Sequence, residues 1–171
     1  MGNFVHLHVH TEYSILDGAT KIAVAAKKAK ALGMPALAIT DHGNMYGAVN
    51  FFDACEKEGI KAIIGTEFYV CDDLAEKTGK PKLRHLVLLC KNEEGYKNIS
   101  LLNAIAFRDG FHYKPRIDLK TLAEHHEGLI CLSACLAGEI PRAITSRMFD
   151  EAERLVEWYK NLFGEDFYLE L

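Results

Sequence analysis

Residues 4–40 read FVHLHVHTEYSILDGATKIAVAAKKAKALGMPALAIT, and this stretch decides the expected fold. Residues 4–9 predict a β-strand. Residues 20–32 predict a helix that Thr20 can cap and that Gly33 ends, and residues 36–40 predict a second strand. A β-α-β unit of this kind is typical of parallel sheets in α/β proteins.

The alternation of strands and helices continues along the chain. A polar stretch at residues 72–83 interrupts it and predicts a surface loop, because it contains Gly79 and Pro81. Further helices are expected at residues 44–59, 93–107, 149–163 and briefly from 118, and further strands at 60–70, 85–90, 129–133 and 167–171. The pattern predicts an α/β fold with a mainly parallel sheet. No helix follows the last strand, so we expect a fragment of a larger barrel.

Length and composition fit one ordinary globular domain. The chain has 171 residues, of which 49% are hydrophobic and 26% charged, so a packed fold is expected. The net charge of −4 provides no broad basic surface for a nucleic acid backbone, and metal ions or a neighbouring domain would have to help. No apolar run approaches the roughly 20 residues that span a membrane. Five scattered cysteines indicate a reducing cytoplasm.

Three histidines, His6, His8 and His10, occupy alternate positions at the first expected strand. Because side chains alternate across a strand, all three should point to one face. A buried parallel strand normally consists of Val, Ile and Leu, so three imidazoles need polar partners. Metal ions and hydrogen bonds explain the motif about equally well, and for His6 we expect only hydrogen bonding.

Other residues able to bind metal lie where expected strands end. His42 follows the second strand, at the edge where α/β folds place their sites, and Asp41 could orient it or simply form a turn. Asp17, seven residues beyond His10, could offer an oxygen ligand or orient a histidine, although Asp-Gly is also an ordinary turn sequence. Glu67 could bridge two metals with its two oxygens, whereas a lone Glu there would usually be solvated.

His85 and Cys135 complete the pattern. His85 opens an expected strand and Cys135 follows the strand at residues 129–133. Each alone would be explained as structural, since free cysteine behaves mainly as a buried hydrophobe. Recurrence in strand after strand makes coincidence a poor explanation. A mixture of imidazole, carboxylate and thiolate suits Zn²⁺, Mn²⁺ or Fe²⁺ better than Mg²⁺.

The motifs, taken in order, resemble a known family. Residues 4–14, with Leu16-Asp17-Gly18 behind them, are similar to the first motif of the N-terminal PHP (polymerase and histidinol phosphatase) domain of bacterial DNA polymerase III alpha subunits. Residues 38–47 are similar to its second motif. The match continues at residues 65–68, 85–89, 132–135 and 167–171. No inserted exonuclease domain interrupts it, which favours the alpha-subunit type over the PolC type.

The resemblance implies a distorted (β/α)7 TIM-like barrel, of which residues 1–171 would be a C-terminally truncated PHP domain. It implies two to three divalent metals at the C-terminal ends of the strands, Zn²⁺ or Mn²⁺ with Fe²⁺ as the alternative. The implied metal ligands are His8, His10, Asp17, His42, Glu67, His85 and Cys135. The last two ligands of the family, an Asp and a His, would lie beyond Leu171, as would the polymerase regions.

The resemblance also implies a function. The full-length protein would be a replicative DNA polymerase, a nucleotidyltransferase, and this domain a metal-dependent phosphoesterase with 3′–5′ proofreading exonuclease activity. His8, His10, Asp17, His42 and Glu67 would act catalytically through bound metals. Expected partners in the bacterial cytoplasm are the 3′ end of DNA, the remaining polymerase domains, and the sliding clamp and other replisome subunits through regions absent here. The alternatives are a scaffold that braces the polymerase or binds a proofreading subunit, and a small-molecule phosphatase.

Overall fold

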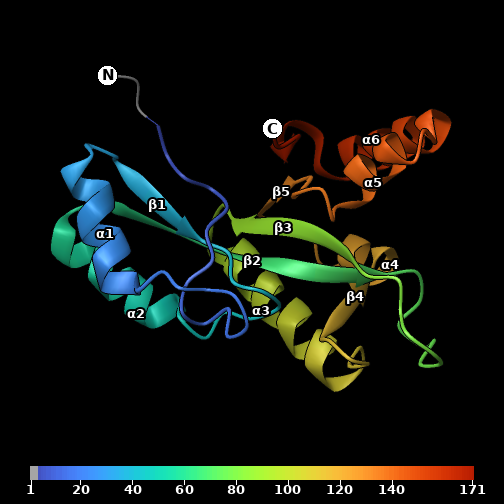
Figure 1. Cartoon of the computed structure of the whole chain (residues 1–171), viewed down its shortest axis with the longest axis horizontal. Helices are drawn as coiled ribbons and strands as arrows, with labels where there is room; N and C mark the ends of the chain where they lie inside the picture. The colour runs from blue at the N-terminus through green and yellow to red at the C-terminus, as the bar shows by residue number, and fades with distance from the viewer. Residues whose placement is uncertain (1–3) are drawn as a thin grey trace.

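The computed structural model describes residues 4–171, which form one sheet with helices packed against it (Figure 1). The helices are α1 (Ile22–Ala31), α2 (Ala48–Glu58), α3 (Glu93–Arg108), α4 (Leu119–Glu124), α5 (Glu139–Thr145) and α6 (Phe149–Phe163). The strands are β1 (Ala36–Ile39), β2 (Lys61–Cys71), β3 (Arg84–Cys90), β4 (Arg116–Asp118), β5 (Leu129–Leu132) and β6 (Phe167–Tyr168). Across this described part, no helix combines the length and apolar character that crossing a membrane requires.

The sheet is open, with strand order β1-β2-β3-β5-β6 and with β4 beside β2. Within the described residues three ladders are parallel, namely β1 with β2, β2 with β4, and β5 with β6. The expected α/β class and mainly parallel sheet are confirmed. However, β3 runs antiparallel to both β2 and β5. The loop at residues 72–83 joins β2 to β3 without a helix, whereas a parallel pair needs a crossover connection, which is usually an α-helix.

Alternate strand residues face opposite sides of the sheet. Leu86 and Leu88 of β3 lie in the main core, which packs against α3 and α6, while Val87 and Leu89 lie in a smaller cluster. A third cluster packs α1 and α2 against β1. The main core therefore lies on one face of the sheet, and Glu67 lies on the opposite face, beside the smaller cluster of Val87 and Leu89.

The first strand expected at residues 4–9 does not form, and that prediction is wrong. The segment runs beside β1, where the Ala38 N–H donates to the His6 carbonyl and the Thr40 N–H to the Val9 carbonyl. The Val9 N–H donates to the Thr40 hydroxyl at 2.8 Å, where a ladder would require a backbone carbonyl. A side chain thus replaces the backbone acceptor and interrupts the ladder.

Several element ends also differ from those expected. Thr20 does not cap α1: Lys21 precedes the helix, and Thr20 forms a bridge with Thr11. The second helix begins at Ala48, because the Asn44 side chain accepts from the Tyr46 N–H and forms a turn first. The last strand has two residues, and β4 and α5 were not expected, since each is too short to show a period. The helix at residues 149–163 is confirmed with the same bounds.

Candidate metal centre

Glu67 of β2 occupies the centre of the site. Its neighbour Phe68 packs in the main core, so the alternation of the strand turns Glu67 to the opposite face. The Glu67 side chain is only 1% exposed. Burial of an ionised carboxylate is costly unless cations or hydrogen-bond donors surround it. The partners of Glu67 therefore decide what the site can do.

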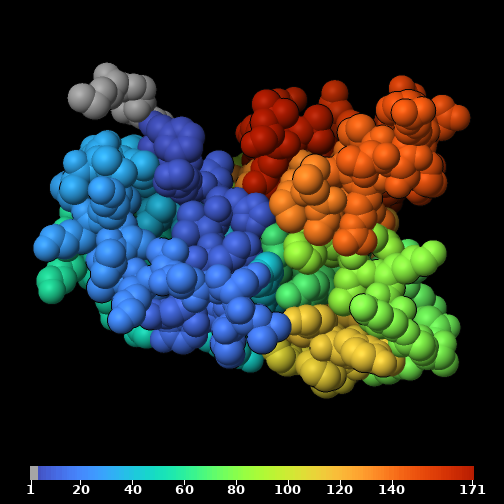
Figure 2. Space-filling model, in the orientation of Figure 1, coloured from blue at the N-terminus to red at the C-terminus, as the bar shows by residue number. Residues whose placement is uncertain are grey.

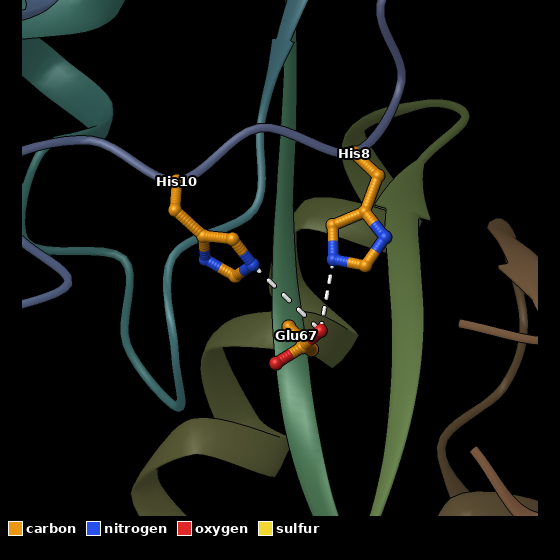
Figure 3. A group of neighbouring side chains, drawn as sticks. All are labelled: His8, His10 and Glu67. Carbon is orange, nitrogen blue, oxygen red and sulfur yellow. Dashed lines mark hydrogen bonds and ion pairs between the residues drawn. The ribbon is translucent and has the colours of Figure 1, made fainter. Parts of the chain in front are cut away.

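Four histidines from three segments surround this carboxylate. Glu67 Oε2 lies 2.8 Å from His8 Nε2 and 3.7 Å from His10 Nε2 (Figure 3). Glu67 Oε1 lies 2.6 Å from His42 Nδ1 and 2.9 Å from His85 Nδ1. Each oxygen thus serves one of two groups able to hold a metal ion, His8-His10-Glu67 and His42-Glu67-His85.

The contact between His42 and Glu67 indicates what the residues fit. His42 Nδ1 and Glu67 Oε1 are both buried, and neither makes a hydrogen bond despite their separation of 2.6 Å. Two facing acceptor atoms without a proton aligned between them would be satisfied by a shared cation. Imidazole nitrogen and carboxylate oxygen are common ligands of Zn²⁺ and related divalent ions. The residues present therefore fit a metal centre.

Two further expected ligands lie at the edge of this cluster. Asp17 Oδ2 is 3.1 Å from His42 Nε2, and its side chain is 64% exposed. Cys135 Sγ is 3.8 Å from His85 Nδ1. All seven residues expected as ligands are thus brought together. His6 lies outside the cluster, where it is exposed, and its ring packs edge-on against Phe4 rather than forming the expected hydrogen bonds.

Asp41 has a role that differs from both interpretations considered for it. Its buried carboxylate accepts hydrogen bonds from the Thr11 N–H, the Thr11 hydroxyl and the Ser14 hydroxyl. Ser14 Oγ also lies 3.1 Å from His10 Nδ1. Asp41 therefore does not contact the His42 ring; it anchors the loop after His10 and positions the His10 ring through Ser14.

Glu170 is a site residue that the sequence reasoning did not single out. Its Oε1 lies 2.9 Å from His8 Nδ1, on the opposite side of the ring from Glu67. The Glu170 N–H donates to Ser133 Oγ at 2.9 Å, which fixes the end of the chain beside β5. The sequence did contain a pattern that could have identified Glu170, because this residue is polar and follows the end of β6, as other candidate ligands follow expected strands. A carboxylate behind a metal-binding histidine typically fixes the orientation of its ring.

The ionisation of the cluster reflects its crowding. Burial lowers the pKa of His8, but contacts with Glu170 and Glu67 outweigh it and raise the pKa to about 10. Burial also opposes ionisation of Glu67, yet His42, His8 and His85 hold its pKa well below the usual range. Burial and the nearby His42 lower the pKa of His10. The site therefore keeps an ionised carboxylate beside at least one neutral imidazole.

Comparison with known proteins agrees with the motifs. The chain matches the PHP domain family over residues 6–171. DNA polymerase III subunit alpha of Treponema pallidum is 50% identical over 97% of this chain and 14% of its own length. The same subunit of Borreliella burgdorferi is 48% identical over 98% of this chain and 15% of its own length.

The chain is also similar to the solved structure of an amidohydrolase from Chromobacterium violaceum. The similarity covers 61% of this chain and 34% of the amidohydrolase chain, at 23% sequence identity and a TM-score of 0.42. The chain spans only about 15% of the length of the curated relatives. The resemblance of this chain to part of the DNA polymerase III alpha subunits is confirmed over 97–98% of the chain. On the family match over residues 6–171, the chain belongs to the PHP domain family.

Proposed function

We propose that this chain acts as the PHP domain of a DNA polymerase III alpha subunit and is a metal-dependent phosphoesterase that removes nucleotides from the 3′ end of DNA. The observation that carries this proposal is the buried Glu67, whose two oxygens face two pairs of histidines. A carboxylate shared between two ligand groups is the arrangement expected of a two-metal hydrolytic site. The relatives supply the context of DNA replication.

His8, His10 and Glu67 would hold one divalent ion, and His42, Glu67 and His85 a second. Asp17 and Cys135 would add ligands, and a third ion, at the edge of the cluster. The ligand types favour Zn²⁺ or Mn²⁺, with Fe²⁺ as the alternative. When bound, such ions supply an activated water near neutral pH and offset the charge of a phosphodiester.

The protein itself contributes orientation. Glu170 and Glu67 hold the His8 ring from both sides, so its plane is fixed before any ligand arrives. Ser14 and Asp41 do the same for His10. Ligands held in place in this way pay little reorganisation cost on binding. Other polymerase domains, the sliding clamp and replisome subunits in a bacterial cytoplasm are the partners within this proposal.

The first test is metal content, measured by elemental analysis of protein purified without chelator or a metal-binding tag. We expect two or more zinc, manganese or iron ions per chain, and loss of nucleotides from the 3′ end of single-stranded DNA. Preferential hydrolysis of a small phosphomonoester would instead identify a small-molecule phosphatase. Protein that binds these ions but hydrolyses neither substrate would refute the catalytic proposal.

One observation also favours a structural role. The cluster joins segments that lie far apart in the chain, since His8, near the start of the described sequence, contacts both Glu67 in β2 and Glu170 near the end. Metal ions bound there would hold the sheet together as well as activate water. Thermal unfolding that follows metal loss, without any nuclease activity, would support a scaffold that braces the polymerase or binds a proofreading subunit.

A further inference from the structure

An open cleft lies directly beside the candidate metal centre. His42 and His85 form part of its lining, so it is continuous with the cluster around Glu67. The loop that carries Ile15 and Leu16 lines the cleft as well, together with Tyr46, Phe107 and Lys114. In Figure 2 the blue N-terminal atoms and the yellow atoms that follow α3 meet at the surface in this region. A ligand in the cleft would therefore reach the histidines.

The cleft and its surroundings contain aromatic rings that are exposed and do not belong to the buried core. Tyr46 is 62% exposed, Phe107 41% and Phe111 51%. The rings form a row, because the centroid of Phe107 lies 6.3 Å from that of Tyr46 and 6.3 Å from that of Phe111. Leu16, 86% exposed, adds apolar surface from the loop. Contiguous apolar surface next to a polar centre marks a binding site more often than scattered residues do.

One cation, Lys114, lines the same cleft near the metal residues. Lys114 Nζ lies 5.3 Å from the centroid of the Tyr69 ring. That ring in turn lies 6.1 Å from the His42 ring and 5.3 Å from the His85 ring. An ammonium group at this position can contact an anion that bridges the rings and the metal centre.

The cleft combines exposed aromatic rings, one cation and the candidate metal centre. This combination fits a nucleotide. The ring faces can stack on a base, and such stacking tolerates any base. The chain carries a net charge of −4, so tracking along a phosphate backbone by a basic surface is not available to it. Recognition of one terminal base is better matched to these residues than recognition of a long strand.

We propose that Tyr46 and Phe107 form a nucleobase subsite, which stacks the 3′-terminal base of single-stranded DNA while Lys114 contacts its phosphate. This inference rests on the proposed nuclease function, since the subsite would present the terminal phosphodiester to the residues around Glu67. The subsite makes hydrolysis depend on a base at the 3′ end. The sequence of that base should matter little, because the contacts are to its face.

The test compares two short fluorescent oligothymidylates, one with a normal 3′-terminal nucleotide and one with an abasic residue there. Phosphorothioate end linkages prevent hydrolysis, and the dissociation constant is measured by anisotropy with the full 171-residue, metal-loaded chain. Phe107→Ala should weaken binding of the normal oligonucleotide about fivefold to tenfold, which corresponds to about 1–1.4 kcal/mol. Binding of the abasic oligonucleotide should not change.

Tyr96→Ala is the matched control, because Tyr96 lies on the same helix α3, is 46% exposed and lines a different part of the surface. Phe107→Tyr keeps the ring and should bind like the unaltered chain. Equal losses on both oligonucleotides, or no loss in Phe107→Ala, would overturn the subsite. A variant that alters only self-association would overturn it too and would identify a protein interface.

The outcome is separable from that of the proposed nuclease function. Base-dependent binding without hydrolysis of an unmodified oligonucleotide would support the subsite and refute the nuclease. Hydrolysis that is indifferent to a terminal base would support the nuclease and refute the subsite.

Discussion

Replacement of Glu67 by Gln should remove both metal ions at once. The change preserves size but removes the charge that the two ligand groups share. Loss of a side chain that only hydrogen-bonds to a metal ligand already lowers the affinity for the metal about 10–100-fold. Because Glu67 would contact both ions directly, we expect at least about 100-fold weaker binding for each group, or about 2.8 kcal/mol per ion.

The assay is metal stoichiometry and affinity by calorimetric titration with Zn²⁺. His10→Ala and His85→Ala should each remove one ion, since each histidine belongs to only one group. Glu139→Gln is the control: Glu139 pairs with Arg84 and Tyr159 away from the cluster, and its variant should keep both ions. A Glu67→Gln protein that binds two ions with unchanged affinity would refute the shared-carboxylate reasoning.

The contacts of His8 and Arg116 can be tested separately from those of Glu67. His8→Ala should lower the rate at which nucleotides are released from the 3′ end of labelled single-stranded DNA at least about 100-fold. Activity that is retained in metal-free protein would contradict the proposed metal-dependent site. A histidine must lose its proton to bind a metal, and Glu170 and Glu67 raise the pKa of His8 to about 10 against the effect of burial, so zinc affinity should rise from about pH 7 towards pH 10. Titrations in which affinity is flat or falls over this range would be inconsistent with His8 as a ligand. Arg116→Lys should lower the free energy of unfolding in urea by at least about 2 kcal/mol, because three separate nitrogens of the buried guanidinium donate to three backbone carbonyls, and the single nitrogen of an ammonium cannot reach all three positions. Arg108→Lys, at an exposed pair, should change it by no more than about 0.5 kcal/mol.

The convergence of the site residues could be predicted from sequence because it depends on a local period. His8 and His10 point the same way in any extended chain, with or without a ladder, so the missing first strand did not affect their direction. The place of His42 follows from the position of strand ends in α/β folds. Glu67, expected where an apolar run ends, instead lies within β2. A parallel bridge holds the two residues together, with the Glu67 N–H donating to the Asp41 carbonyl.

The features that sequence reasoning missed depend on side chains competing with the backbone or on long-range pairing. The Thr40 hydroxyl takes the place of a ladder acceptor, which no hydrophobic pattern reveals. The reversal of β3 could have been inferred, since the loop at residues 72–83 was expected to contain no helix. The contact of Glu170 with His8 spans nearly the whole chain, and period alone carries no information about such distances.

The crowding of the cluster is itself an argument for metal rather than for a network of hydrogen bonds. Each imidazole nitrogen that faces Glu67 within 2.6–2.9 Å needs a proton or a cation between the two atoms. His8 and His42 each face a second carboxylate with the other ring nitrogen, so protons on both nitrogens would make both rings cationic. The His42 ring is also stacked on the His10 ring, with centroids only 4.0 Å apart. That proximity is why His42 lowers the pKa of His10. Divalent ions remove the conflict, because they satisfy the same nitrogens while the imidazoles stay neutral. The arrangement that is costly as a salt-bridge network is therefore well suited to a metal centre.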